Sequence, residues 1–505
     1  MTDFESDESK ISLEKELRER HLELTPDGSA LRWRRDNPKY PRNWTGLRKF
    51  YDTGVICLLD LFITASSTAG AAAAAEAKHE YHLDPTLATF CFVSLFLLGQ
   101  CLGNIVLPPW SECFGRKRMY LLSSGLSSIC CAVIGLVHSL PTAIIMRIIA
   151  GTLAAVPGTI LGGSIEDLFN SQARIWVVFF WTAASNIGLI LGPIMSSYII
   201  EALDWRWVFF TYAMILAALT ILLMFIKESR SSCVLTCEVN KLRHILPTIP
   251  SALNHDHSPD MQTFAKEALF RPVQLFFQEP IIFTISMMIS VAMSIIYIFT
   301  EALQPIYQSM GFSASQASLI FMAIGLGTCF STLTRILDCY IFNRRRDQGL
   351  PIKPEHKLAG LAIGVPFLAV GLWWFGWTIP PKVPALGGHW VVPTVALVLV
   401  GYALTELDSV LYGYISDSYL SYSASATAAV AFMRGMLSAT FPLFTNQMFD
   451  GLGANIAVSI LAAVATVFCV VPPLFICYGE RIRKKSRFAR YSWEIQEEMG
   501  KEDEI

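Results

Sequence analysis

Long apolar segments recur along the chain, and short polar stretches separate them. A helix that crosses a bilayer needs about 20 predominantly apolar residues. The pattern therefore predicts an all-α membrane protein with twelve transmembrane helices. The first six are expected at 50–72, 86–107, 118–138, 141–164, 175–199 and 206–227. The second six are expected at 279–302, 314–337, 358–379, 390–413, 424–447 and 455–478.

Polar segments divide these helices into two sets. A stretch containing Ser, His, Asp and Pro separates the sixth span from the seventh. The predicted parts are an N-terminal segment at 1–49, a six-helix bundle at 50–227, a linker at 228–278, a second six-helix bundle at 279–478 and a tail at 479–505. Residues 36–50 mix aromatic and basic side chains, as an interfacial anchor does. Residues 261–278 have the spacing of a helix lying on the inner membrane surface.

The positions of Lys and Arg predict the orientation in the membrane, because short cytoplasmic loops carry an excess of both residues. Basic clusters at 116–118, 344–346 and 481–487 all fall on one side of the predicted membrane. The opposite loops contain little more than Lys78 and Lys382. We therefore expect both termini and the linker to be cytoplasmic.

Composition narrows the class of protein further. Hydrophobic residues make up 53% of the chain and charged residues 16%, against about 25% charged residues in soluble proteins. A net charge of −2 gives no reason to expect a nucleic-acid partner. The 12 Cys lie in apolar or predicted cytoplasmic segments without metal-like spacing. We therefore expect no disulfide framework, no metal and no cofactor.

The sequence also lacks common enzyme signatures. It contains no Gly-Lys-Ser/Thr phosphate loop, no Gly-x-Ser-x-Gly elbow and no paired His cluster. These absences argue against an enzyme and against an ATP-driven pump. A receptor or scaffold on a transporter fold would need a long signalling tail, and only 27 residues (505 − 478) follow the last predicted span.

The loop after the second span reads Pro-Pro-Trp-Ser-Glu-Cys-Phe-Gly-Arg-Lys at 108–117. It resembles the Gly-x-Leu-Ala-Asp-Arg-x-Gly-Arg-Lys loop of the major facilitator superfamily. The matching positions are Glu112, Gly115, Arg116 and Lys117. Pro108 replaces the first glycine, and Cys113 replaces the basic residue after the acid.

Motifs in other spans extend this resemblance. Arg147 and Gly151 match the Arg-x-x-x-Gly pattern of the fourth span. The Gly-x-x-x-Gly-Pro motif of antiporters is matched by Gly188, Gly192 and Pro193. Similar stretches near the C-terminus lie at 417–419, 423–426, 434 and 441–444. Over about residues 36–490, the chain resembles the fungal branch of the twelve-span drug:proton antiporters.

This resemblance implies two pseudo-symmetric bundles that rock around a central site near the midplane. It also implies proton-coupled efflux of a small organic molecule across the plasma membrane by a monomer. The substrate class stays open between a drug, a fungal secondary metabolite and an organic acid. Uncoupled facilitation or uptake is the alternative within the same class.

Charged side chains inside spans cost roughly 2.5–3.5 kcal/mol each on insertion scales, so those that persist usually serve a cavity or a partner. Asp60 lies near the predicted midplane and is our first candidate for carrying the proton. Its alternative is a structural aspartate bonded to a Ser or Thr such as Thr64. Arg434 lies at a depth where Glu406 or Asp408 could meet it, either as a functional pair or as a static one.

The remaining candidates rest on position and resemblance. Arg147 is expected to serve substrate binding or coupling, and Glu301 is either a coupling residue or a solvated rim charge. Gly188 and Gly192 would allow close helix contact, and Pro193 would bend its helix. The resemblance implies a cytoplasmic latch formed by Glu112, Gly115, Arg116 and Lys117 together with Asp417.

Overall fold

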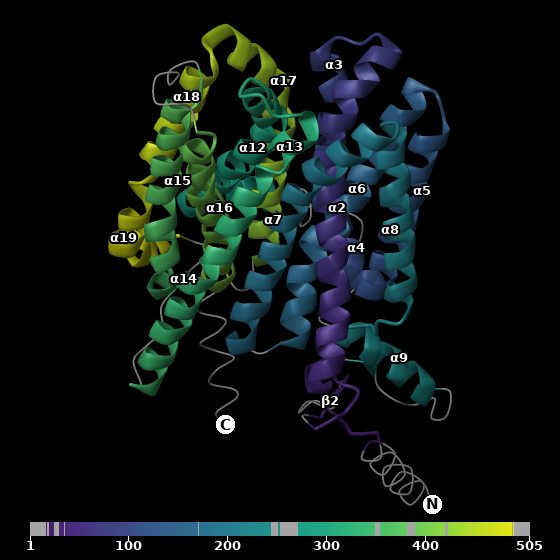
Figure 1. Cartoon of the computed structure of the whole chain (residues 1–505). Coiled ribbons are helices and arrows are strands. Elements are labelled where there is room, and N and C mark those ends of the chain that lie inside the picture. Colours follow the sequence, from purple (N-terminus) through teal and green to yellow (C-terminus); the bar gives the residue numbers. More distant parts are fainter. Residues whose placement is uncertain are drawn as a thin grey trace, which may run out of the picture.

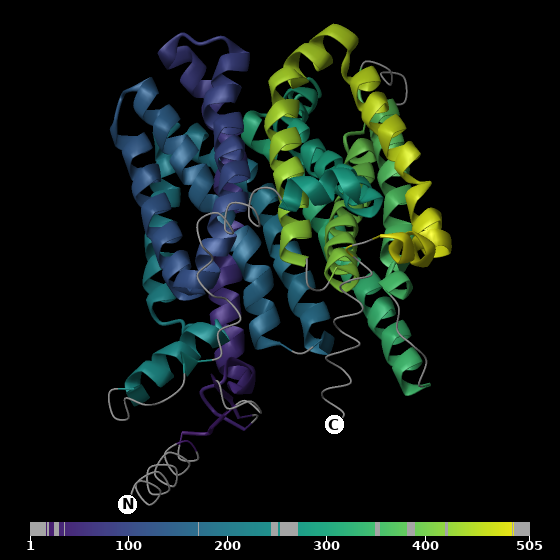
Figure 2. The ribbon, with the colours of Figure 1, turned by 180° about the vertical axis from the view of Figure 1, so that it is seen from behind.

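The computed structural model describes residues 17, 20–24, 30–34, 36–169, 171–243, 251–252, 271–348, 354–380, 389–419, 423–486 and 488. Two helical bundles stand side by side (Figures 1 and 2). In the described residues, twelve helical segments are long and apolar enough to cross a membrane, which confirms the predicted number. We call inner the side on which the first of them begins at Gly46, and outer the opposite side.

The first bundle contains the first six spans. They are α2 (Gly46–Tyr81), the continuous stretch α3 (Pro85–Thr89), η2 (Phe90–Ser94) and α4 (Leu95–Phe114), then α5 (Arg116–Leu136), α6 (Leu140–Leu168), α7 (Ser171–Ala202) and α8 (Arg206–Met224). The η2 segment is a π-helical turn inside the second span. α2 is longer than the predicted first span at both ends, because apolar and small residues continue to Ala77 beyond residue 72.

The second bundle contains the other six. They are α12 (Pro280–Gln308), α13 (Ala314–Ser318) with α14 (Phe321–Asp347), α15 (Ala359–Thr378), α16 (Val391–Ser418), α17 (Ser423–Leu452), and α18 (Ala454–Phe468) with α19 (Val471–Lys485). The last span is thus interrupted at residues 469–470. The proline pair that follows, Pro472 and Pro473, lacks backbone donors and fits the first turn of a new helix better than the interior of an old one.

Two pairs of helices make the largest part of the contact between the bundles. α4 packs against α17, and α7 packs against α14. Near the outer ends, α3 also contacts α17 and α13 contacts α7. The short α11 (Arg271–Gln278) packs against α17 on the second-bundle side. α11 corresponds to the C-terminal part of the surface helix predicted at 261–278, and residues 261–270 lie outside the described residues.

A carboxylate from a distant loop caps the start of α5. Gly115 adopts a φ of +88°, a conformation that favours glycine. Glu228, just after α8, accepts hydrogen bonds from the main-chain N–H groups of Arg116 (2.9 Å) and Lys117 (3.0 Å). A negative group at a helix N-terminus is stabilised by the unpaired N–H groups and by the helix dipole. The contact fixes the loop of the predicted latch within the first bundle.

The N-terminal segment and the linker form one unit on the inner side, here called the N-terminal–linker module (Figure 1). β1 (Leu22–Leu24) pairs antiparallel with β2 (Ala30–Trp33), and β2 pairs parallel with β3 (Ser251–Ala252). The sheet packs on α9 (Ser231–Arg243). Its apolar core consists of Leu17, Leu22, Leu31, Leu235, Val239 and Leu242. Sequence reasoning treated the two segments as separate, because the pairing joins residues more than two hundred positions apart.

Charged contacts also hold this module together. The Glu238 carboxylate on α9 lies 2.8 Å from the Lys39 ammonium and 2.9 Å from that of Lys241. Burial raises the pKa of Glu238, but the hydrogen bonds from the two ammonium groups outweigh burial and leave the pKa below its ordinary value. The ionised form is therefore the one that the folded module favours.

We predict that the module loosens as the pH falls. A carboxyl with a depressed folded-state pKa contributes stability above its ordinary pKa, about 4.3 for Glu, and loses it as the pH falls through the folded-state pKa. Protection factors of the amides in 20–24 and 231–243, that is, exchange rates corrected for the intrinsic effect of pH, should be higher at pH 7 than at pH 4 in the full chain. Glu238→Gln should reduce that difference, and equal pH dependence in both proteins would contradict the role of Glu238.

Candidate functional site

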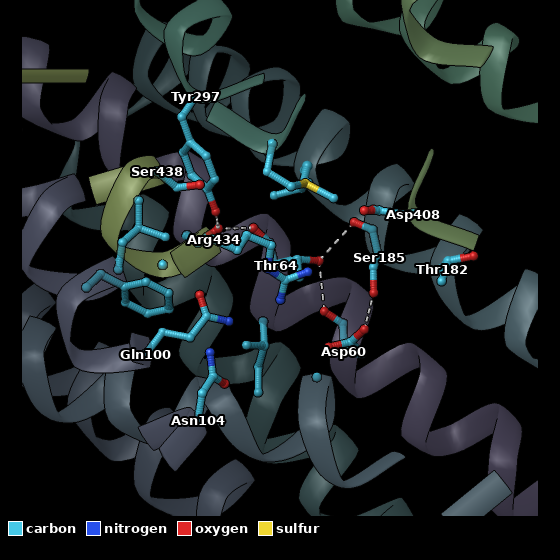
Figure 3. A pocket seen from close by; sticks show the side chains of 18 of the residues that line it. Asp60, Thr64, Gln100, Asn104, Thr182, Ser185, Tyr297, Asp408, Arg434 and Ser438 are labelled. Atoms are coloured by element: carbon cyan, nitrogen blue, oxygen red, sulfur yellow. Dashed lines mark hydrogen bonds between the residues drawn. The ribbon is translucent and has the colours of Figure 1, made fainter. Parts of the chain in front are cut away.

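A cavity lies between the two bundles, near the middle of the spans (Figure 3). Helices α2, α4, α6 and α7 line it from the first bundle, and α12, α16 and α17 from the second. Its polar lining consists of Asp60, Thr64, Ser67, Gln100, Asn104, Thr182, Ser185, Tyr297, Asp408, Tyr412, Arg434 and Ser438. Both bundles therefore contribute to one central site, as alternating access requires.

Asp60 is held by two donors from α7. Its carboxylate accepts a hydrogen bond from the Trp181 indole N–H at 2.9 Å and another from the Ser185 hydroxyl. The Thr64 hydroxyl donates instead to the main-chain oxygen of Asp60, at 2.8 Å. The Thr64 hydroxyl therefore does not reach the carboxylate, and the Ser or Thr partner that the structural alternative calls for is Ser185 instead. Sequence reasoning missed Trp181 and Ser185, because only tertiary structure brings α7 against α2.

Arg434 and Asp408 bring charge to the cavity from the second bundle (Figure 3). Arg434 interacts electrostatically with Asp408 and with Asp60. No ion pair within 4 Å joins it to a carboxylate among the described residues. Oδ1 of Asp408 is buried without a hydrogen-bond partner in the same part of the chain. If all three groups are ionised, they leave one net negative charge at the site.

The cavity lining also includes aromatic and apolar side chains, and two of its polar residues carry amide groups. The rings of Phe96 and Trp181 and the side chain of Met293 offer apolar surface. Gln100 and Asn104, one turn apart on α4, offer amide donors and acceptors. Such a mixture of apolar walls and directed polar groups suits small organic molecules.

Glu406 does not meet Arg434, which corrects one of the two predicted alternatives. It lies on α16 two residues before Asp408, and two residues on an α-helix differ by about 200° around the axis. Asp408 therefore faces the cavity, whereas Glu406 faces α14 and lies 2.8 Å from Arg335. Sequence depth alone could not distinguish the two faces.

Arg147 is also absent from the cavity lining. It is 1% exposed and donates to the main-chain oxygens of Phe92 (2.8 Å from Nε) and Ser66 (3.4 Å). Its guanidinium stands 4.6 Å from the centre of the Phe96 ring. Phe92 belongs to the π-helical turn η2, whose irregular backbone leaves a carbonyl available to a side chain. Arg147 thus ties α2, η2 and α6 together, one residue layer behind the cavity.

Glu301 is half-buried, so it is not a fully solvated rim charge. It is one turn outward from Tyr297 on α12, and its Oε1 is buried without a hydrogen-bond partner among the described residues. It interacts electrostatically with Lys78 at the outer end of α2. Glu301 is not part of the cavity lining.

Gly188 and Gly192 lie where α7 packs against α2. A Cβ at Gly188 would overlap Thr64 Oγ1 and the Leu61 carbonyl, and one at Gly192 would overlap Thr68 Oγ1 and the Ala65 carbonyl. Pro193 follows inside the same helix. The two glycines therefore allow α7 to approach α2 closely enough for Ser185 and Trp181 to reach Asp60.

The predicted latch residues make contacts within their own bundles. The Arg116 guanidinium lies 2.9 Å from Asp167, at the inner end of α6. Asp417, at the inner end of α16, lies 2.5 Å from the Lys357 ammonium. Glu112 is part of α4, but its side chain lies outside the described residues. Sequence reasoning missed Asp167 and Glu228 as partners of this loop.

Comparison with known proteins places the chain in a family. The family model described as Major Facilitator Superfamily matches residues 55–442. The chain therefore belongs to the major facilitator superfamily, and it is a membrane transporter. This confirms the fold class and the family resemblance predicted from the motifs.

Relatives in fungi match most of the chain. It is 29% identical over 474 residues to the multidrug transporter TPO1_2 of Candida glabrata, covering 93% of this chain and 80% of that protein. It is 29% identical over 460 residues to the efflux pump radE of Floropilus chiversii, covering 90% of this chain and 84% of that protein.

Solved structures share the fold at low sequence identity. The proton:xylose symporter XylE aligns with a TM-score of 0.62 at 15% identity, over 86% of this chain and 97% of that chain. The human organic anion transporter MFSD10 aligns with a TM-score of 0.58 at 15% identity, over 84% of this chain and 99% of that chain. At this identity the similarity concerns the fold alone.

We predict that Gly188→Ala and Gly192→Ala destabilise the protein. The added methyl must push α7 away from the α2 backbone, and overpacking of this kind costs about 1–3 kcal/mol. Thermal unfolding of the purified protein in detergent should show a lower Tm for each variant. Gly125→Ala on α5 is the matched control, because its nearest atom would lie at 3.7 Å. An unchanged Tm in the Gly188 and Gly192 variants would refute the close packing.

Proposed function

We propose that this transporter exports a small organic molecule in exchange for protons, by rocking its two bundles around the central cavity. The observation that carries the proposal is the charge of that cavity: Asp60 from one bundle faces Asp408 and Arg434 from the other. The names of the fungal relatives, a multidrug transporter and an efflux pump, support export as the direction.

Charge balance gives the coupling a physical basis. A buried and uncompensated negative charge is costly, so the site favours either one proton or a positively charged group. A proton and a substrate that occupy the same carboxylates exclude one another, and their alternation across the membrane is antiport. In this proposal Asp60 carries the proton, while Trp181 and Ser185 stabilise its ionised form once the proton leaves.

The contacts between the bundles support rocking. They include hydrogen bonds from Ser94 to the Ala439 carbonyl (2.7 Å) and from Gln447 to Thr86 (2.7 Å). A net contribution of about 0.5–1.5 kcal/mol is typical of one such neutral bond. The ion pairs of the latch residues, by contrast, lie within single bundles. Neutral contacts across the interface can exchange during each cycle at low cost.

The proposal also includes the orientation in the membrane, the kind of membrane, the substrate class and the oligomeric state. The positions of Lys and Arg favour cytoplasmic termini, and the fungal efflux relatives favour the plasma membrane. A drug or a secondary metabolite with a positively charged group fits the two carboxylates, whereas an organic acid would have to pair with Arg434. The transporting unit is a monomer. The apolar and aromatic walls around Phe96 and Trp181 suit a substrate with a ring system or an extended apolar body.

We predict that Asp60→Asn abolishes proton-driven accumulation but retains exchange. The wild type in proteoliposomes should accumulate one of a panel of drugs, polyamines and di- or tricarboxylates only when a pH gradient is imposed. Asn is close in shape to Asp but cannot carry the proton, so uptake should no longer follow the gradient, whereas substrate counterflow should persist.

The matched control is Glu76→Gln, which neutralises an exposed carboxylate on the same helix. It should behave as the wild type. Transport that ignores the pH gradient in the wild type would replace antiport with uncoupled facilitation. Gradient-driven transport that survives in Asp60→Asn would remove Asp60 from the proton path.

A further inference from the structure

A second group of buried charges lies in the second bundle, apart from the cavity. Arg335 and Asp338 belong to α14, and Glu406 belongs to α16. The Arg335 guanidinium lies 3.1 Å from the Asp338 carboxylate and 2.8 Å from that of Glu406. The three side chains are 7%, 5% and 0% exposed, respectively. None of them lines the cavity.

The charges in this group do not cancel. Two carboxylates surround one guanidinium, so full ionisation leaves one net negative charge in the interior. The Lys357 ammonium interacts with Asp338, but it forms an ion pair with Asp417 at 2.5 Å. Among the described residues, Oε1 of Glu406 and Oδ1 of Asp338 are buried without a hydrogen-bond partner. A buried oxygen without a donor is unstable as part of an anion.

Helix α15 closes over the Glu406 side chain. A Cβ at Gly360 would overlap Glu406 Oε2, and a Cβ at Gly364 would lie 3.0 Å from Glu406 Cβ. The two glycines, one turn apart, thus form a recess that the glutamate fills. The recess brings no charged group to the carboxylate, because Gly360 and Gly364 have no side chains.

The other neighbours also fail to balance the charge. Tyr402 and Cys339 interact electrostatically with the group, and the Tyr402 hydroxyl is hydrogen-bonded to that of Thr334 at 2.6 Å. The first bundle contributes the ring of Phe179 on α7, whose centre lies 6.0 Å from the Arg335 guanidinium. A tyrosine, a thiol and an aromatic ring add no full positive charge.

We propose that Asp338 and Glu406 share one proton beside Arg335 and so form a second proton-binding site of the protein. With the proton bound, one guanidinium faces one carboxylate and one neutral carboxyl, which can donate a hydrogen bond. The site lies against α7 through Phe179, so the rocking of the bundles changes how well it is shielded from water. Proton exchange at this site accompanies that movement.

The proposal is tested by infrared spectroscopy on the full-length protein in liposomes. Pairs of spectra at different pH report the C=O stretch of protonated carboxyl groups and its shift in D₂O. We expect Glu406→Gln and Asp338→Asn each to remove the same band, with the intensity of one carboxyl. Each substitution leaves Arg335 with one carboxylate, so neither variant needs the proton. The double variant should lose no more than either single variant.

The control is Asp347→Asn, an exposed carboxylate on the same helix α14, which should leave the band unchanged. Gel filtration and Tm verify that each variant is folded, and Asp338→Asn and Glu406→Gln test the site independently. Single variants that retain every protonated-carboxyl band would overturn the proposal, as would a double variant that loses two carboxyls. A band that appears only when sodium is removed would assign the site to a metal cation instead.

The outcome is independent of the transport proposal. Proton binding is measured here without a substrate, and Asp60 is intact in every variant. If the single variants lose the band but wild-type transport ignores the pH gradient, the second proton site stands and antiport is rejected. If the variants keep every band but wild-type transport follows the pH gradient, antiport stands and the second proton site is rejected.

Discussion

Placing charge inside a bilayer is costly, and this constraint explains why several ionisable side chains within the two bundles are held by specific partners. Arg147 is satisfied by main-chain carbonyls and by aromatic rings. Asp60 is satisfied by the hydroxyl and indole donors of α7. Arg335 lies between two carboxylates. Arg434 and Asp408 in the cavity are different, because Arg434 approaches Asp408 and Asp60 without forming a close ion pair with either. A proton or a charged substrate stabilises such a site more than it would stabilise a site whose charges are already paired.

Close helix packing creates the setting for these charges. Glycines at 188 and 192 bring α7 onto α2, which places Trp181 and Ser185 beside Asp60. Glycines at 360 and 364 bring α15 onto α16 and enclose Glu406. The same device therefore appears in both bundles, each time beside a buried carboxylate. Small residues at helix contacts are common in membrane proteins. The feature that links these two contacts to proton binding is the buried carboxylate beside each of them.

Rigid bundles and a soft interface together suit alternating access. Within each half, charged contacts such as Arg116–Asp167 and Lys357–Asp417 fix the inner ends of helices. Across the interface, Ser67 and Tyr297 share a hydrogen bond of 2.9 Å at the cavity, and the other bonds described there are also neutral. The N-terminal–linker module adds a folded connection on the inner side, because residues before α2 pair with residues between the bundles. The module therefore ties the start of the first bundle to the chain that leads to the second.

The amino-acid sequence by itself determined the number of spans and their separation into two sets, because a bilayer imposes segment length and composition directly. The family was indicated separately, by the resemblance of its motifs. The sequence also identified Asp60, Asp408 and Arg434 as charges at cavity depth. Tertiary structure alone decided which partners these charges have. Glu406 and Asp408 look equivalent in the sequence, yet the helical twist turns them to opposite faces, toward Arg335 and toward the cavity. Arg147 was expected at the site and lies behind it, whereas Trp181 and Ser185 were found only in the fold. Depth in the membrane can be read from a linear pattern, but the direction of a side chain depends on which helix packs against it.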